Sequence, residues 1–415
     1  MLPDAAARAS RRVESLLREL DPIGHEAAHP EAGYHRAAWT PEDLQLRGWF
    51  RDRAEGLGLR LEQDRVGNLW AWWLPENLTD PSEIQPGTAT TCGSHLDSVP
   101  GGGRYDGPLG VVSALVAVEL LQQTGWVPAH PLGIVCFSDE EGARFRIACF
   151  GSRVLTGALS PERALACTAE DGTSLASALT AGGVSPANYG PDPSLMARIR
   201  GHVELHVEQG YALAPAAAPL GVATAIWPHG RWHVALTGEA NHAGTTPLER
   251  RDDPTLRLAD LIRTAREAAE ECGGVATVGK ILVTPNGVNV IPSQVDAWVD
   301  VRAPDEAVLD AILHRLEDFG LERESRTPAT HFDPTLAETL GDACIAATGT
   351  AAPHIPTAAG HDAGILQDAG VPSGMLFVRS TTGASHTPAE AATETDCGLG
   401  ALALAEAIRQ LERAE

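Results

Sequence analysis

The sequence predicts an α/β protein with a mainly parallel sheet and covering helices, interrupted by a smaller α+β domain. Residues 88–138 read as strand, helix and strand, the repeating unit of parallel sheets. The second of these strands, residues 132–137, is wholly apolar, as expected for a strand buried on both faces. Two breaks in composition, at residues 212–219 and 324–334, suggest linkers around an inserted domain.

The elements of the larger domain follow from the spacing of apolar residues. Residues 88–93 are β-prone, and apolar residues recur with helical spacing from 108 to 125. Residues 202–208 alternate strictly, which predicts a strand with histidines and glutamates on one face and an apolar core face on the other. Residues 375–378 form a further apolar strand. Each predicted strand therefore ends close to polar residues.

The inserted domain is expected in residues 218–331, which leaves 1–217 and 332–415 for the larger domain. Its predicted strands are residues 231–237, 280–284 and 296–302, and its predicted helices are near 255–271 and 306–319.

Composition excludes several classes of protein. The 415 residues suffice for two to three domains of about 150 residues. With 31 basic and 55 acidic residues, the formal net charge of −24 disfavours nucleic acids and anionic membranes as partners. The sequence contains no run of about 18 consecutive apolar residues, so it predicts no transmembrane helix. The seven cysteines include no Cys-x-x-Cys pair, and no signal peptide is recognisable. Both observations predict a cytoplasmic protein.

Polar residues after neighbouring strands form the strongest functional signal. His95 precedes Asp97 by two residues, and such a carboxylate can accept the second imidazole N–H of a metal-bound histidine. Asp106 lies in a glycine-rich loop and could bridge two ions. Of the adjacent acids Glu140 and Glu141, one can bind metal while the other carries protons. Because these loops leave one sheet edge, they predict a metal site there.

Taken alone, each part of this signal has a simpler explanation. A single His-x-Asp is more often structural, and adjacent glutamates usually form a solvated loop. His202 and His206 share one strand face, and spacing does not decide which of them would be a ligand. The glycines around Asp106 do not follow Gly-x-Gly-x-x-Gly, so a tight turn explains them better than a phosphate loop.

Six motifs follow one another along the chain: GSHLDSVPGGGRYDGPLG, FSDEEGARF, HVELHVEQG, GEANHAGTTPLERRDDP, NVIP with WVDVR, and AAGHDAGI with GASHTPAE. In this order they resemble the group of N-carbamoyl-L-amino acid hydrolases, allantoate amidohydrolases and β-ureidopropionases. That group belongs to the superfamily of dinuclear zinc aminoacylases and carboxypeptidases. The resemblance covers roughly residues 20–410. It implies a catalytic domain and a smaller domain that serves as lid and dimer interface.

For the metal centre, the resemblance implies two divalent ions, with Zn²⁺, Mn²⁺ and Co²⁺ as candidates. It implies that His95 and His206 bind one ion, Glu141 and His386 the other, and Asp106 both. Asp97 would support His95, and Glu140 would be the general base. A histidine at position 206 is similar to the ureido-hydrolysing branch, because the peptidases and aminoacylases usually have aspartate there.

For the substrate, the resemblance implies a small ureido acid, hydrolysed to ammonia, carbon dioxide and an amine. Gln209, Asn289, Arg302 and His242 would bind it, and His242 would stabilise the oxyanion from the neighbouring subunit of a homodimer. Allantoate and N-carbamoyl-L-amino acids both fit. The polar loop at Arg379 slightly favours allantoate, unless Arg379 pairs with a structural acid. The alternatives are an aminoacylase or dipeptidase on the same fold and, remotely, a catalytically silent binding protein.

Overall fold

The computed structural model describes residues 2–25 and 29–413, and these form two units. The first unit contains residues 1–224 and 331–415, and the second contains residues 225–330. The predicted α/β class is confirmed. The first unit extends past the expected limit at 217 because β6 (Leu220–Ile226) pairs with β15 (Ser373–Val378) in the large sheet.

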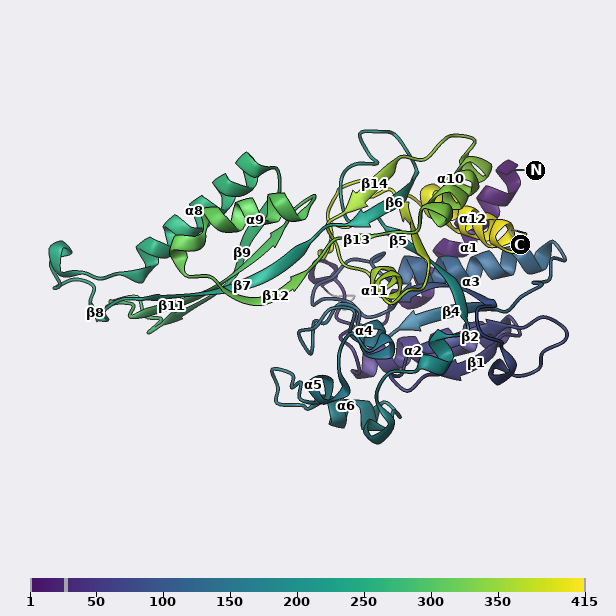
Figure 1. Cartoon of the computed structure of the whole chain (residues 1–415), viewed down its shortest axis with the longest axis horizontal. Coiled ribbons are helices and arrows are strands. Elements are labelled where there is room, and N and C mark those ends of the chain that lie inside the picture. The colour runs from purple at the N-terminus through teal and green to yellow at the C-terminus, as the bar shows by residue number, and fades with distance from the viewer. Residues whose placement is uncertain (1, 26–28, 414–415) are drawn as a thin grey trace. The chain divides into compact units, whose positions relative to one another are not determined.

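A nine-stranded sheet forms the centre of the first unit (Figure 1). Its order is β1-β2-β4-β3-β5-β15-β6-β13, and β14 also pairs with β6. The four central strands are parallel: β4 (Leu132–Phe137), β3 (Ala89–His95), β5 (Ile199–Val207) and β15. The remaining strands are β1 (Arg60–Gln63), β2 (Leu69–Trp73), β13 (Thr330–His331) and β14 (His354–Thr357). The carboxyl ends of the four parallel strands share one edge, where ligands bind in open sheets.

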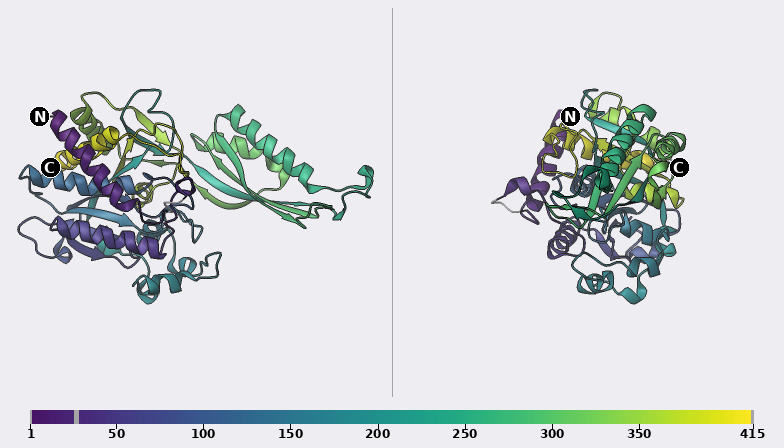
Figure 2. Two further views of the ribbon diagram at one scale, coloured as in Figure 1. Left: turned by 180° about the vertical axis from the view of Figure 1, so that it is seen from behind. Right: turned by 90° about the vertical axis from the view of Figure 1, so that its left-hand side faces the viewer.

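Helices cover both faces of this sheet. One core contains residues of α1 (Leu2–Leu20), α2 (Pro41–Gly56), α3 (Pro108–Gln123), α10 (Pro334–Thr348) and α12 (Glu394–Leu411). The other contains residues of α4 (Phe150–Thr156), α5 (Pro161–Leu165), α6 (Leu175–Ala181), α7 (Pro193–Met196) and α11 (Asp362–Asp368). The first and last helices, α1 and α12, lie side by side (Figures 1 and 2). In the described part of the chain, no helix is long and apolar enough to cross a membrane.

Strand β5 shows what two covered faces imply for polar residues. Polar and apolar residues alternate along this strand, but the polar side chains are not exposed to solvent. His202, Glu204 and His206 are all at most 1% exposed. A strand in the middle of a covered parallel sheet has no solvent face. These polar side chains must therefore find partners inside the protein.

Short polar residues begin several helices. The side chains of Asp253, Asp305, Asp333 and Thr393 each accept a hydrogen bond from a first-turn amide of the helix that follows. These helices are α8 (Pro254–Cys272), α9 (Glu306–Arg315), α10 and α12. Each cap satisfies an amide that has no partner within its helix.

The second unit is a four-stranded antiparallel sheet packed against two helices. Its strand order is β12 (Glu322–Thr327), β7 (His229–Thr237), β11 (Gln294–Arg302) and β9 (Val275–Thr284). Its core joins β7 and β11 to α8 and α9. Part of the expected linker 324–334 is therefore strand β12. A short ladder of β8 (Asn241–His242) and β10 (Val290–Ile291) lies beyond one end of β7 and β11 (Figure 1).

Candidate metal centre

Polar side chains of the first unit meet at the carboxyl ends of the four parallel strands. They come from the end of β3, the loop after β4, the end of β5 and the loop after β15: His95, Glu140 and Glu141, His206, and His386. Asp106 joins them from the loop before α3. Four strand ends and one loop thus place all five predicted metal ligands and the predicted base close together.

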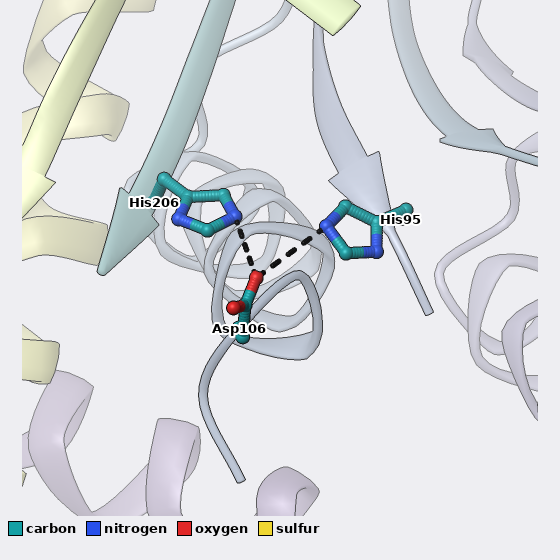
Figure 3. Close-up of side chains that lie close together, drawn as sticks. All are labelled: His95, Asp106 and His206. Carbon is teal, nitrogen blue, oxygen red and sulfur yellow. Dashed lines mark ion pairs between the residues drawn. The ribbon is translucent and has the colours of Figure 1, made fainter. Parts of the chain in front are cut away.

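Asp106 faces two groups of ligand-type side chains. Its Oδ1 lies 3.3 Å from Nε2 of His206 and 3.7 Å from Nε2 of His95 (Figure 3). Its Oδ2 lies 3.4 Å from Nε2 of His386, which is also 3.4 Å from Oε2 of Glu141. Two ligand atoms of one tetrahedral zinc ion are about 3.3–3.6 Å apart when each bond is about 2.0–2.2 Å. Both groups therefore have the dimensions of a metal site, and they share Asp106.

Backbone carbonyls orient the two buried imidazoles of this cluster. Nδ1 of His95 is 3.0 Å from the carbonyl oxygen of Asp97, and Nδ1 of His206 is 2.9 Å from that of Val207. A carbonyl only accepts, so Nδ1 donates and Nε2 is available to a metal. Both Nε2 atoms are buried without a hydrogen-bond partner among the described residues. Unsatisfied buried nitrogens aimed at a carboxylate are what a cation between them would explain.

Asp97 contacts both His95 and the glutamate pair. Its carboxylate is 3.6 Å from Nδ1 of His95, and its own backbone carbonyl is the nearer partner of that nitrogen. The carboxylate also accepts hydrogen bonds from the backbone amides of Glu140, at 3.2 Å, and Glu141, at 3.1 Å. Asp97 therefore holds the glutamate pair beside His95.

The adjacent glutamates face different neighbours. Glu141 lies against His386, whereas Oε2 of Glu140 is 3.7 Å from Nε2 of His95. Burial raises the pKa of Glu140 well above its ordinary value; His95 opposes this rise, and Asp362 adds to it. A carboxylate with a raised pKa holds a proton more tightly than a free one.

Backbone conformation at the site is unusually constrained. Gly107 has a φ of +83°, and a Cβ there would lie 2.4 Å from the ring of His95. Only glycine allows this approach. Several other residues have positive φ values although they carry side chains: Asp139, Cys149, Gln209 and His386. Strained backbone of this kind concentrates at functional sites.

Glu390 contacts the loop that carries Asp106, and it was not predicted as a site residue. Its carboxylate accepts hydrogen bonds from the backbone amides of Tyr105, at 2.6 Å, and Asp106, at 3.1 Å. A Cβ on Gly103 would lie 2.4 Å from the Glu390 carboxyl carbon, so glycine is needed there too. The signal in the sequence was weak: Glu390 follows His386 by four residues in the same motif.

His361 and Cys149 were also not predicted as site residues. The ring of His361 packs against that of His206, with 4.6 Å between centroids, and forms a ligand-type group with His206 and Glu204. The oxygens of Glu204 already accept hydrogen bonds from the hydroxyl of Ser94 and the amide of Ala363. Sγ of Cys149 is 3.2 Å from Oε1 of Glu140. No pattern in the sequence points to Cys149.

The structure places His202 outside the ligand-type groups and Gln209 directly beside Asp106. Nδ1 of His202 is 3.0 Å from the hydroxyl of Thr91, and His202 belongs to no ligand-type group within residues 2–25 and 29–413. Spacing left His202 and His206 equivalent, and the structure brings His206 to the cluster. The amide of Gln209 donates to Oδ2 of Asp106 at 2.7 Å. Gln209 therefore lies directly at the cluster.

The remaining predicted residues, His242, Asn289 and Arg302, belong to the second unit. His242 lies on β8, and the amide of Ala243 donates to the carbonyl of Asn289 at 3.0 Å. His242 and Asn289 are therefore neighbours at one end of this unit.

Arg302 lies at the other end of the second unit. It is the last residue of β11, and its Nε donates to Asp300 at 2.8 Å. A rise of about 3.4 Å per residue places it about 27 Å from Gln294 at the start of that strand. Strand β8, which contains His242, lies beyond that start (Figure 1). One copy of the second unit thus separates Arg302 from His242 by more than the length of a small ureido acid.

Arg379 pairs with an acid of the first unit. Its Nη2 and Nε donate to Oδ2 of Asp396 at 2.8 and 3.0 Å, and Asp396 lies in the first turn of α12. This is the structural pairing that the sequence left as the alternative. The preference for allantoate that was drawn from the Arg379 loop is therefore not supported.

Residues 91–410 match Peptidase family M20/M25/M40, a range that covers most of the chain. The chain belongs to this family. The M20 family is metal-dependent, and the ligand-type groups around Asp106 agree with that property. The family resemblance predicted from the six motifs is confirmed.

Relatives of this M20 protein include hydrolases of ureido compounds. It is 35% identical to an N-carbamoyl-L-amino acid amidohydrolase of Geobacillus stearothermophilus, over 97% of this chain and 99% of the relative. It is 32% identical to allantoate amidohydrolase of Escherichia coli, over 96% and 97%. A crystal structure of a hydantoinase/carbamoylase family amidase from Burkholderia vietnamiensis superimposes with a TM-score of 0.84 and 31% identity, over 97% of each chain.

Proposed function

We propose that this M20-family protein is a metal-dependent amidohydrolase that cleaves the ureido C–N bond of a small ureido acid. The observation that carries the proposal is Asp106, whose two carboxylate oxygens face two separate groups of ligand-type side chains. Relatives named for N-carbamoyl-L-amino acids and for allantoate support the substrate class. Both kinds of compound combine a ureido group with a carboxylate.

We assign His95 and His206 to one ion, Glu141 and His386 to the other, and Asp106 to both. Buried carboxylates are costly unless positive charge offsets them. Around Asp106 their ion-pair partners are histidines rather than permanent cations. Divalent ions would supply Lewis acidity, which activates water and polarises a carbonyl. Mixed imidazole and carboxylate ligands suit Zn²⁺, Mn²⁺ or Co²⁺.

Glu140 is the proposed general base. It would take a proton from the attacking water and deliver it to the leaving nitrogen, while the water oxygen bonds to the ureido carbon and the C–N bond breaks. The hydrogen bonds from Glu140 and Glu141 to Asp97 would keep both glutamates in place during this transfer. This cleavage would release ammonia and leave a carbamate, whose remaining C–N bond would then break to give carbon dioxide and the freed amine.

The substrate-binding groups support a homodimer. The guanidinium of Arg302 is a planar fork suited to a carboxylate. Because His242 lies more than about 25 Å from Arg302 within one copy, a small substrate that contacts both groups must contact two copies. Strand β9 offers a surface for a second copy, because it ends the sheet order and exposes three apolar side chains: Val275, Ile281 and Leu282.

Cysteine chemistry supports a cytoplasmic location. All seven cysteines are unpaired. Free thiols persist in reducing compartments, whereas secreted proteins usually form disulfides.

The test is ammonia release from allantoate, N-carbamoyl-L-methionine and N-carbamoyl-β-alanine, with metal-loaded and metal-free protein. We expect turnover of at least one of them, abolished by chelation and restored by Zn²⁺, Mn²⁺ or Co²⁺. N-acetyl-L-methionine and a dipeptide, with release of free amino acid as the readout, test the aminoacylase and dipeptidase alternatives. A kcat/KM at least tenfold higher for either control compound would replace the proposal, and full activity in a metal-free sample would refute it.

The same measurement decides between the two ureido substrates. A second ureido group that lost its hydrogen bonds on burial would lower the affinity for allantoate. Polar donors in the site therefore favour allantoate, and an apolar wall favours carbamoyl amino acids. A tenfold preference in kcat/KM for one of them assigns the substrate.

A further inference from the structure

Cys149 touches the carboxylate that we assign as general base. Its Sγ lies 3.2 Å from Oε1 of Glu140, within hydrogen-bond distance for a thiol donor. The second oxygen of Glu140, Oε2, lies 3.7 Å from Nε2 of His95. The contact therefore distinguishes the two oxygens: one is held by the thiol, and the other faces the cluster. Cys149 is 1% exposed, so bulk water does not compete for this bond.

The main chain determines the direction of this thiol. The amide of Cys149 donates to the carbonyl of Glu140 at 2.5 Å, and the next amide, of Phe150, donates to the carbonyl of Asp139 at 2.9 Å. These bonds join the start of α4 to the loop after β4. Cys149 also has a φ of +53°, which is unfavourable for a residue with a side chain. The surrounding structure must hold it there, and its Cβ direction is fixed accordingly.

We propose that Cys149 is a positioning residue: its thiol holds Oε1 of Glu140 and so keeps Oε2 directed at the metal cluster. This inference rests on the proposed function, in which Glu140 is the base. A thiol is a weak donor, so it can orient the carboxylate while withdrawing less of its negative charge than a hydroxyl would. Cys149 touches neither the predicted ligands nor a substrate group through this contact, and it acts through Glu140 alone.

The test compares Cys149→Ala and Cys149→Ser with Cys136→Ala as the matched control. Cys136 is also 1% exposed and lies on β4 before the same loop, but its Sγ faces the carbonyl of Phe137 at 3.9 Å. Without a donor, Cys149→Ala should lower kcat about tenfold at unchanged KM and metal content, because a misplaced base slows the chemical step. Cys149→Ser restores a donor and should recover most of this loss. Cys136→Ala should retain wild-type kcat.

A second measurement does not depend on turnover. The S–H stretching band of Cys149 can be isolated as the infrared difference between the wild type and Cys149→Ser, in metal-free protein. A hydrogen bond to a carboxylate is stronger than one to a neutral amide. Glu140→Gln should therefore shift this band to higher frequency, whereas the bands of the other six cysteines should stay unchanged.

Each outcome decides the inference. Wild-type kcat in Cys149→Ala, or an S–H band that does not respond to Glu140→Gln, would overturn it. Equal losses in the Ala and Ser variants, together with lost metal or a lower melting temperature, would show a purely structural cysteine and overturn it too. If Cys149→Ala does not fold, the serine variant and the infrared band decide. If the wild type hydrolyses no ureido acid, the proposed function fails, and the band alone decides whether the thiol holds Glu140.

Discussion

The backbone amide of Glu140 donates a hydrogen bond of 3.2 Å to the carboxylate of Asp97. Asp97 follows β3 and Glu140 follows β4, so this bond joins the loops of two neighbouring parallel strands. The second oxygen of the same carboxylate accepts the amide of Glu141. One buried side chain thereby sets the distance between His95 and the glutamate pair.

Asp97→Asn should loosen the metal centre. The side-chain nitrogen of the new asparagine would face a backbone N–H, so one of the two hydrogen bonds to the glutamate loop would be lost. We expect metal affinity to fall by about 10–100-fold, as for other groups that orient metal ligands. Metal titration against a competing chelator measures this. Asp171→Asn, which alters an exposed aspartate that also accepts a backbone amide, should leave affinity unchanged.

The two glutamates should respond differently to the same substitution. Glu140→Gln removes the base but no assigned ligand, so both ions should stay bound while kcat falls at least about 10²-fold. Glu141→Gln should instead reduce the bound metal. Metal content and kcat, measured together on each variant, test the assignment. Loss of metal in Glu140→Gln with retention in Glu141→Gln would reverse the two roles.

Activity should require groups from two subunits. A His242→Ala chain and a Glu140→Gln chain, each inactive alone, should regain activity after mixing, because one site of each heterodimer would have both groups intact. Mixing His242→Ala with Asn289→Ala is the control. These two residues adjoin on the same unit, so each site of that heterodimer lacks one of them. No recovery in the first mixture after verified subunit exchange would exclude a shared site.

His202 should make the protein less stable in mild acid. Burial lowers its pKa to about 3, so it stays neutral in the folded state, whereas in the unfolded state it gains a proton below about pH 6.5. The contribution of His202 to the free energy of unfolding is therefore fully present above about pH 6.5 and is lost as the pH falls toward 3. Between about pH 7.5 and 5.5 the loss should reach about 1.4 kcal/mol.

Urea unfolding of the wild type and of His202→Gln at both pH values isolates this contribution. The variant should lose about 1.4 kcal/mol less than the wild type over this interval. His314→Gln, at an exposed histidine on α9, should behave like the wild type. An identical pH response in His202→Gln and the wild type would show that His202 is not held neutral.

Local patterns predicted the catalytic fold well. Residues 132–137 coincide with β4, and the helix expected from 108 onward is α3. The strict alternation at 202–208 lies within and just after β5. Apolar periodicity was sufficient because it records which faces of each element are covered. The second linker was predicted less well, because residues 322–327 pair with β7, and no local signal records that partner.

Contacts between distant residues account for what the patterns missed. Glu390 bonds the amide of Asp106 across 284 positions in the chain. Arg379 pairs with Asp396 although its loop resembles a substrate-facing one. The carboxylate of Asp97 accepts the amides of Glu140 and Glu141 besides lying 3.6 Å from Nδ1 of the neighbouring His95. In each case the residue types were visible in the sequence, but the partner was not.

Residue types and strand ends are local properties, so the sequence predicts that histidines and carboxylates gather at one edge of a parallel sheet. Spacing could not distinguish His202 from His206; the family resemblance implied His206, and the tertiary structure places His206 beside Asp106 and His202 beside Thr91. It also decided that His242 and Arg302 lie at opposite ends of the second unit. These outcomes depend on which strands are neighbours in a sheet and on the register between them. Contacts between residues far apart in the sequence determine both.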